Sequence, residues 1–257
     1  IFETDPVGLG ARRTEPIPAD GEAPAPETLR VLEGVELQGR LNTAPATLLA
    51  NIRANIRRGH PQARVEAVKP DRVCLVGSGP SLDETIDELR ALYLAGAKIV
   101  ALNGALAWLL ERNFKPSAAV VVDARPSTAR FVAPDVPGML YYVASQCDPA
   151  VFDQVEGRER VAIWHSLTDE NEMAAVLDSY YGAGHWLGVT GGTTVASRAL
   201  SLLRSSGYLR FDLFGVDCCW LNDRHHAFDQ IENAGDRRVR VSVKAATSSE
   251  APAVFEC

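Results

Sequence analysis

The chain has 257 residues, of which 46% are hydrophobic and 23% charged, and its formal net charge is −7. This composition is typical of a globular protein with one sizeable core, and the acidic balance argues against a general binder of nucleic acid or of anionic membranes. No apolar run approaches the ~20 residues of a membrane-spanning helix, and the N-terminus has no signal-peptide pattern.

The first elements are an arm and a helix. Residues 1–45 are rich in Pro, Gly, Ala and acidic residues, and we expect an extended or disordered arm. Residues 46–70 are predicted to form a helix and a connector. The helix, over 46–58, is indicated by apolar residues at helical spacing, namely Leu48, Leu49, Ile52 and Ile56.

Strands and helices then alternate over residues 71–235, where we expect a nucleotide-binding domain. The predicted strands are 73–76, 98–102, 118–122, 139–143, 160–164 and 211–216, and the predicted helices are 82–95, 104–113, 149–155, 170–181 and 192–206. The strands are continuous apolar runs, as in a sheet covered on both faces. The pattern predicts an α/β, Rossmann-like, doubly wound and mostly parallel sheet.

Residues 236–257 alternate Val with polar residues, which predicts an antiparallel edge or hairpin. The chain neither starts with Met nor closes this last element, so we expect it to be truncated. Its five cysteines form no C-x-x-C pair, which favours reduced thiols and a cytoplasmic location.

The junction after the first strand is rich in glycine: Gly77, Ser78, Gly79, Pro80 and Ser81. Glycines here let a ligand approach free N–H groups, and phosphates commonly bind at this point of an α/β sheet. Ser81 and Glu84 have capping-box spacing. The alternative is a tight strand–helix connection without a ligand.

Polar residues follow the other strands, at the sheet edge where ligands bind in such folds. They are Asn103, Asp123, Ser145 with Gln146, His165 and Asp217. Three have structural alternatives. Asn103 could cap the next helix, Asp123 could serve a turn, and His165 could be an ordinary packed imidazole.

Two later segments complete the predicted site. Gly191, Gly192, Thr193 and Thr194 open a long helix with no acidic residue in its first turn, which favours an anion, although an N-cap with a close backbone approach is the alternative. Arg224, His225 and His226 follow Asp217 in a polar segment, which we expect to be a mobile loop that closes over the ligand.

The order of Gly-Ser-Gly-Pro-Ser-Leu, Ala-Leu-Asn-Gly-Ala, Val-Val-Val-Asp-Ala, Gly-Gly-Thr-Thr and Phe-Gly-Val-Asp resembles the MptE-like family. That family is named for an archaeal 6-hydroxymethyl-7,8-dihydropterin diphosphokinase. The segment from Val143 to Phe152 looks most like that of family members carried by tailed phages. This resemblance would place the protein in a host cytoplasm. The skeleton is more distantly similar to bacterial sialyltransferases that use CMP-activated sugars.

The resemblance implies a transferase that binds a nucleotide at Gly77–Ser81, Asn103 and Gly191–Thr194. The implied reaction is transfer of the diphosphoryl group of ATP to a hydroxymethylpterin-like small molecule. Mg²⁺ would be bound by Asp123 and Asp217, and Asp123, Asp217, His225 and His226 would act in catalysis. The alternatives are a glycosyltransferase that uses a CMP-activated or other nucleotide sugar, and a non-catalytic nucleotide-binding module.

Overall fold

The computed structural model describes residues 43–167, 170–217, 220–221, 224–228, 240–243 and 253–256. The predicted N-terminal arm lies outside these residues except for 43–45. The described residues fall into two compact units: the larger comprises 43–217 and 226–228, and the smaller includes 220–221, 224–225 and the two C-terminal strands.

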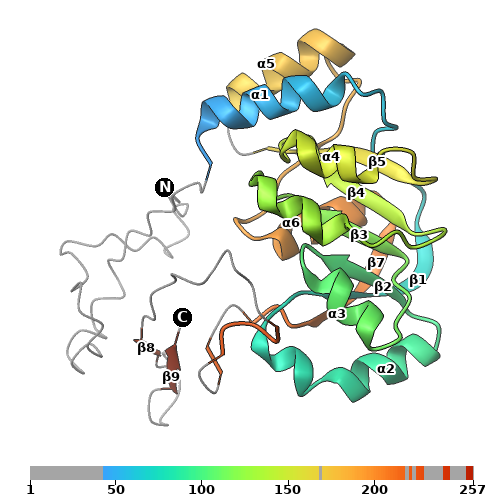
Figure 1. Ribbon diagram of the computed structural model, residues 1–257, viewed down its shortest axis with the longest axis vertical. Helices are drawn as coiled ribbons and strands as arrows, with labels where there is room; N and C mark the ends of the chain where they lie inside the picture. Colours follow the sequence, from blue (N-terminus) through green and yellow to red (C-terminus); the bar gives the residue numbers. More distant parts are fainter. Residues whose placement is uncertain are drawn as a thin grey trace. The chain divides into compact units, whose positions relative to one another are not determined.

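The larger unit is built on one sheet of seven parallel strands in the order β6-β5-β4-β3-β2-β1-β7 (Figure 1). The strands are β1 (Lys69–Val76), β2 (Lys98–Leu102), β3 (Ala118–Val121), β4 (Leu140–Ala144), β5 (Val161–Ser166), β6 (Gly188–Val189) and β7 (Tyr208–Phe214). The prediction of an α/β, Rossmann-like parallel sheet is therefore confirmed.

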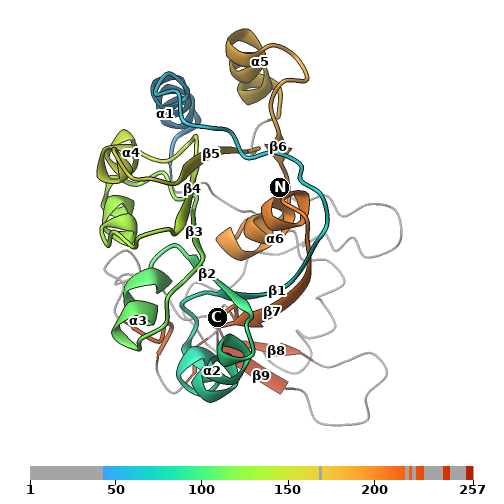
Figure 2. The same cartoon turned by 90° about the vertical axis from the view of Figure 1, so that its right-hand side faces the viewer.

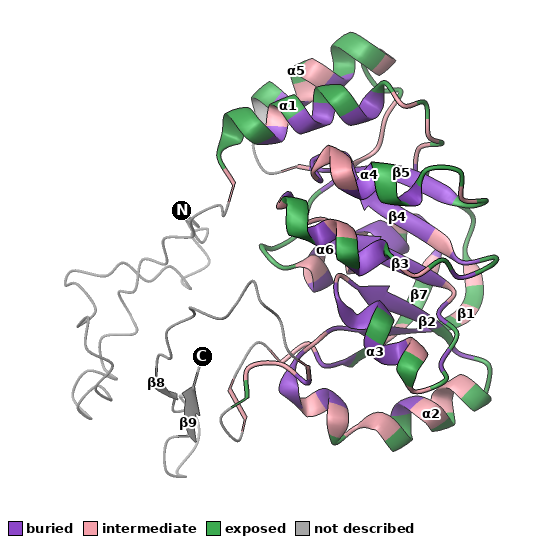
Figure 3. Ribbon diagram, in the orientation of Figure 1, coloured by how far each residue is buried: buried purple, intermediate pink, exposed green. Residues whose placement is uncertain are grey.

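Helices cover both faces of this curled sheet. They are α1 (Pro45–Ile56), α2 (Ile86–Leu94), α3 (Ala105–Glu111), α4 (Pro149–Val155), α5 (Glu170–Tyr181) and α6 (Val195–Ser205), with 3₁₀ helices η2 (Pro80–Asp83) and η3 (Pro126–Val132). Figure 2 shows α2, α3 and α4 on the outer side and α6 inside the curve. Strands β2 to β5 are accordingly almost wholly buried (Figure 3), which explains their apolar sequences.

The predicted helix 82–95 is two elements. Residues Pro80–Asp83 form η2, and α2 begins only at Ile86, after Thr85. The capping-box prediction is wrong, because the Ser81 hydroxyl donates to the Asp217 carboxylate at 2.8 Å. The two-residue strand β6 was not predicted, since so short a strand leaves no periodicity in the sequence.

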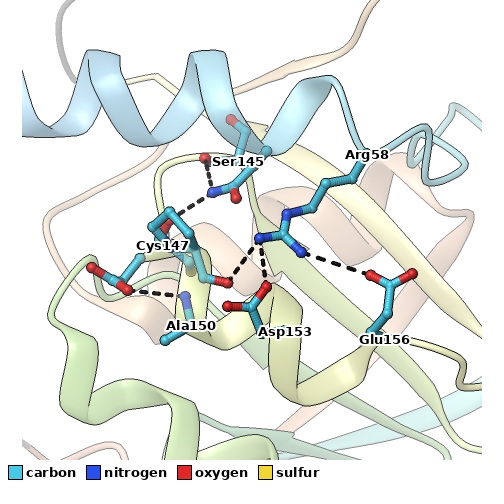
Figure 4. Close-up of polar contacts among 9 residues, drawn as sticks. Arg58, Ser145, Cys147, Ala150, Asp153 and Glu156 are labelled. Atoms are coloured by element: carbon cyan, nitrogen blue, oxygen red, sulfur yellow. Dashed lines mark hydrogen bonds and ion pairs between the residues drawn. The ribbon is translucent and has the colours of Figure 1, made fainter.

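Helix α1 is joined to the loop after β4 by two buried asparagines. The Asn55 side chain donates to the carbonyl oxygens of Ser145 and Cys147, at 3.0 and 2.7 Å, and Asn51 donates to that of Gln146 at 3.1 Å. Figure 4 shows Ser145 and Cys147 beneath α1. Buried carbonyl groups need such partners, so these contacts fix α1 on the sheet.

Arg58, just after α1, adds an ion pair to this contact. Its guanidinium lies 2.6 Å from Asp153 and 3.7 Å from Glu156, both from the α4 region (Figure 4). Because Asp153 and Glu156 are largely exposed, the pair adds little energy, and the two buried asparagines dominate the attachment.

The smaller unit contains an antiparallel pair, β8 (Arg240–Val243) with β9 (Ala253–Glu256). The hairpin predicted within 236–257 is thus confirmed. Among the described helices of the chain, none has the length and apolar character needed to cross a membrane.

Candidate functional site

The glycine-rich loop after β1 packs against the end of β7. The Gly77 N–H donates to the Phe214 carbonyl at 2.8 Å, and the Gly79 N–H donates to that of Gly215 at 2.7 Å. A Cβ atom on Gly77 would lie 2.3 Å from the Gly215 oxygen. These glycines therefore allow a tight strand–helix connection, which was the alternative to a ligand site. The N–H groups of Gly77 and Gly79 already donate to backbone carbonyl groups.

Asp217 holds the same loop from the end of β7. Its carboxylate accepts bonds from the Ser81 N–H at 3.1 Å and from the Ser81 hydroxyl at 2.8 Å. A Cβ atom on Gly79 would lie 2.2 Å from the carboxylate. A side chain at position 79 would hence displace Asp217 itself.

His226 is the histidine that joins this loop. Its Nδ1 lies 3.2 Å from the Ser78 hydroxyl, and the Ala227 N–H donates to the Ser78 carbonyl at 2.9 Å. Phe228 lies beside Gly104, where a Cβ atom would be 3.4 Å from its ring. Residues 226–228 therefore cover the loops after β1 and β2.

His225 and Arg224 belong to the smaller unit. His225 stacks on Trp220, with ring centroids 5.1 Å apart, and Arg224 forms a backbone bridge with Leu221. The two adjacent histidines thus fall in different compact units, and His226 belongs to the unit that contains the sheet. Closure of this segment over a ligand stays a prediction.

Asp123 follows β3 and pairs with Arg125, whose Nη2 and Nε lie 2.5 and 3.0 Å from its carboxylate. Strands β3 and β7 are separated by β2 and β1. Asp123 and Asp217 are therefore about 14 Å apart along the sheet, at ~4.8 Å per strand. No three His, Cys, Asp or Glu side chains gather as metal ligands within the described ranges. A Mg²⁺ ion shared by Asp123 and Asp217 stays a prediction. It requires both carboxylates to leave these partners and to approach one another by roughly 10 Å, because Mg²⁺–O distances are ~2.1 Å.

Buried polar atoms without hydrogen-bond partners lie along the carboxyl ends of β2 to β5. In the part of the chain that the structure describes they include Asn103 Oδ1, Thr128 Oγ1, Ser145 Oγ, Gln146 Oε1 and His165 Nδ1. Such atoms are rare in folded proteins, because each costs the desolvation of a polar group. Other atoms of this kind lie elsewhere, for example in Asn55, His60 and Trp108, but those at the strand ends share one edge, where a polar ligand would supply the missing bonds.

Asn103 is the most informative of these residues. It has a left-handed backbone, with φ +44°, and α3 starts after Gly104 without a side-chain cap, so the capping alternative is wrong. Gln146 also faces this edge, since its Nε2 donates to the Val122 carbonyl at 3.2 Å. Thr128, in η3, was missed because nothing in the sequence distinguishes it from an ordinary turn residue.

His165 lies inside β5, which extends two residues beyond the predicted strand. Its Nε2 is 3.3 Å from Gln62 Oε1, and its ring packs against Tyr181 and Trp186. Burial lowers the pKa of His165 to about 4, so the imidazole is neutral near pH 7. This environment agrees with the alternative that His165 is an ordinary packed imidazole, although its Nδ1 makes no hydrogen bond.

His165 gives a testable pH dependence. The unfolded chain binds a proton at His165 below pH ~6.5, whereas the folded chain does so only near pH 4, so the proton favours unfolding. The free energy of unfolding is expected to fall as the pH is lowered through this window. Denaturant titrations of wild type and His165→Gln should show a shallower pH slope in the variant, and equal slopes would contradict the assignment.

The turn before α6 keeps its donors free. Thr194 is the N-cap, and its hydroxyl accepts the Ser197 N–H at 3.2 Å. The N–H groups of Gly191, Gly192 and Thr193 donate no hydrogen bond among the described residues. The N-cap alternative is thus correct, and the first turn of α6 has no acidic residue to oppose an anion.

The curled parallel sheet and its polar carboxyl edge define a Rossmann-like α/β protein with a candidate ligand site at the strand ends. Residues 46–223 match the MptE-like family, described as 6-hydroxymethylpterin diphosphokinase MptE-like. The chain belongs to this family.

Comparison with solved structures found similar chains. The MAf glycosyltransferase from Magnetospirillum magneticum AMB-1 matches with a TM-score of 0.60 and 21% identity, over 90% of this chain and 34% of that one. The chain therefore spans about a third of that protein. A mammalian sialyltransferase matches with a TM-score of 0.38 and 13% identity, over 75% of this chain and 71% of that one. The comparison with curated proteins gave no significant match.

Proposed function

We propose that this protein is a transferase whose nucleotide donor binds along the carboxyl ends of β2 to β5 and at the start of α6. The observation that carries the proposal is the row of buried, unpaired polar atoms at these strand ends. Membership of a family named for a diphosphokinase supports the proposal further. The fold, which the chain shares with a glycosyltransferase, is compatible with it.

The described residues suggest a division of roles. Asn103, Ser145 and Gln146 would hydrogen-bond the base and ribose, because their unpaired atoms follow β2 and β4 at the same edge of the sheet, one strand apart. The free N–H groups before α6 would bind phosphate. The Gly77–Ser81 loop would contribute Ser78 and hold His226, which would act as acid or base toward the acceptor.

The reaction we propose first is transfer of the diphosphoryl group of ATP to a hydroxymethylpterin-like acceptor. Mg²⁺ would then neutralise phosphate charge, with Asp123 and Asp217 as its carboxylate ligands once the two strand ends approach one another. The second candidate is a glycosyltransferase with a CMP-activated or other nucleotide sugar, which the shared fold favours. A module that binds a nucleotide without catalysis is the third candidate.

A nucleotide panel tests these candidates. ATP, GTP, CTP and CMP-sialic acid, each with and without Mg²⁺, are titrated calorimetrically against the protein. We expect ATP with Mg²⁺ to bind most tightly. Tightest binding of the CMP-sugar without metal would replace the diphosphokinase with the glycosyltransferase, and absence of any nucleotide binding would contradict the proposal as a whole.

The site is tested by Asn103→Asp, which keeps the shape and the tolerance for positive φ but adds a negative charge. We expect it to weaken nucleotide binding at least ~10-fold, equal to about 1.4 kcal/mol. Asn113→Asp is the matched control, because Asn113 also has a positive φ, +60°, and is exposed after α3. Equal affinities of the two variants would remove Asn103 from the site.

A further inference from the structure

Strand β7 ends the sheet on one side and has an open edge. It pairs with β1, and no other described strand pairs with it. Phe214 directs its carbonyl group toward β1, where it accepts the Gly77 N–H. Because backbone groups alternate sides along a strand, the N–H and C=O groups of Leu209, Phe211 and Leu213 face outward. Such a row of donors and acceptors is a template for another strand.

This edge lacks the usual protection against pairing. Leu209 and Leu213 are 52% and 51% exposed, although both are large and apolar. The strand contains no proline, and the irregularity in its pairing adds a residue to β1, between Lys69 and Arg72, so β7 itself is regular. Proteins commonly block a free edge with lysine, proline or a bulge, so an unblocked apolar edge indicates a partner strand.

The sequence of β7 identifies the partner. It reads Tyr-Leu-Arg-Phe-Asp-Leu-Phe and is chemically symmetric about Phe211, with a charge, a leucine and an aromatic residue on each side. The two charges have opposite signs. A second copy of β7, antiparallel and centred on Phe211, would place Arg210 opposite Asp212 of the other copy and Leu209 opposite Leu213. Opposite charges and apolar pairs across two strands stabilise a sheet.

The backbone allows the same register. Because Phe211 faces outward, it forms a hydrogen-bonded pair with its own copy, as do Leu209 and Leu213, which gives about six bonds at two per pair. Arg210 and Asp212 then oppose one another in non-hydrogen-bonded pairs, where side chains lie closer. A shift by one residue would oppose outward and inward groups. A shift by two would place Arg210 opposite Arg210, or Asp212 opposite Asp212.

The charged groups are available for these pairs. Arg210 is exposed and makes no hydrogen bond or ion pair with the described residues. The Asp212 carboxylate accepts from Arg72 at 2.5 and 2.6 Å, and its side chain is still 22% exposed. A carboxylate has about four acceptor sites, so Asp212 can bind a second guanidinium.

We infer that β7 is the interface of a symmetric dimer, in which two copies of this strand pair antiparallel about Phe211. The two sheets then join into one. The carboxyl ends of the strands in the two copies face opposite directions, so the dimer leaves both candidate ligand sites open. The inference is independent of the proposed function.

Sedimentation equilibrium of the whole chain tests the dimer. We expect wild type to dimerise, and Arg210→Asp and Asp212→Arg each to dimerise at least ~10-fold more weakly, because each opposes like charges at two places across the axis. Arg53→Asp is the matched control, since Arg53 is exposed on α1 at the other end of the sheet, and it should dimerise as wild type does. Wild type that is monomeric at every concentration would overturn the inference.

A mixture of the two variants tests the register. Position 210 of each chain then faces the opposite charge at position 212 of the other, so an equal mixture of Arg210→Asp and Asp212→Arg should form heterodimers with nearly wild-type affinity. Damage to the fold cannot be repaired by mixing, and a mixture that stays monomeric would overturn this register.

A further variant covers the case in which Asp212→Arg does not fold because it loses the Arg72 contact. Leu209→Pro removes only an outward-facing N–H group, which an edge strand tolerates, and it should abolish the dimer without a large loss of Tm. A folded Leu209→Pro variant that dimerises as wild type does would overturn the interface.

Hydrogen exchange separates a second copy from other occupants of this edge. We expect protection of the Leu209, Phe211 and Leu213 amides to increase with protein concentration, in parallel with the dimer fraction. Strong protection of these amides in a monomer, independent of concentration, would assign the edge to another segment of the same chain and overturn the dimer.

Discussion

Replacement of Gly77 with alanine is expected to destabilise the protein by at least about 3 kcal/mol, the upper end of the usual cost of overpacking. The added methyl group would lie 2.3 Å from the Gly215 carbonyl oxygen, and a backbone atom cannot move aside as a side chain can. The contact joins β1 to β7, so separation of the two loops would loosen that edge of the sheet. The free energy of unfolding from urea titration measures the effect.

Gly96→Ala is the control for this substitution. Gly96 has a φ of +93°, and no atom lies within 4 Å of the place its Cβ atom would occupy. Only the backbone strain remains, and it costs roughly 1–2 kcal/mol. A Gly77→Ala variant that loses no more stability than Gly96→Ala would show that the β1–β7 contact is not tightly packed.

His226→Ala is expected to lower kcat/KM with an accepted substrate at least ~10²-fold, the usual scale for a lost acid–base group. The reason is its position: Nδ1 lies 3.2 Å from the Ser78 hydroxyl, in the glycine-rich loop after β1. Ser78→Ala should give a smaller loss, since Ser78 only orients the ring. Steady-state kinetics with the best donor of the nucleotide panel measure both variants.

His185→Ala provides the matched control, because His185 is exposed and lies in the loop between α5 and β6. Wild-type activity in the His226→Ala variant would remove this histidine from the mechanism. A loss in His185→Ala of the same size would indicate that alanine substitution of any histidine disturbs the fold.

The centre of the sheet could be predicted because β2 to β5 are almost wholly buried, so each is a mostly apolar run such as the Val and Ala residues of β3. The N-terminus of α2 could not. Ser81 has the spacing of a capping residue, but its hydroxyl binds Asp217, 136 residues later. Local spacing carries no information about such a partner, and the tertiary contact prevailed.

The candidate site was predictable in part, because its position follows from the position of the strands. The rule that ligands bind at the carboxyl ends of strands selected Asn103, Ser145, Gln146 and His165, whose unpaired atoms lie there. The glycine motif was ambiguous, because the sequence does not show whether the space beside a glycine is occupied by a ligand or, as here, by the backbone of Gly215.

The attachment of α1 also has a consequence for the order in which the nascent chain can fold. Asn51 and Asn55 bind carbonyl groups some 90 residues further along the chain. At a synthesis rate of ≈ 5–20 residues per second, roughly 5 to 20 s pass between emergence of the helix and emergence of its partners. During that interval the apolar face of α1, with Ile52 and Ile56, has no sheet to cover, and a ribosome-associated chaperone could bind it.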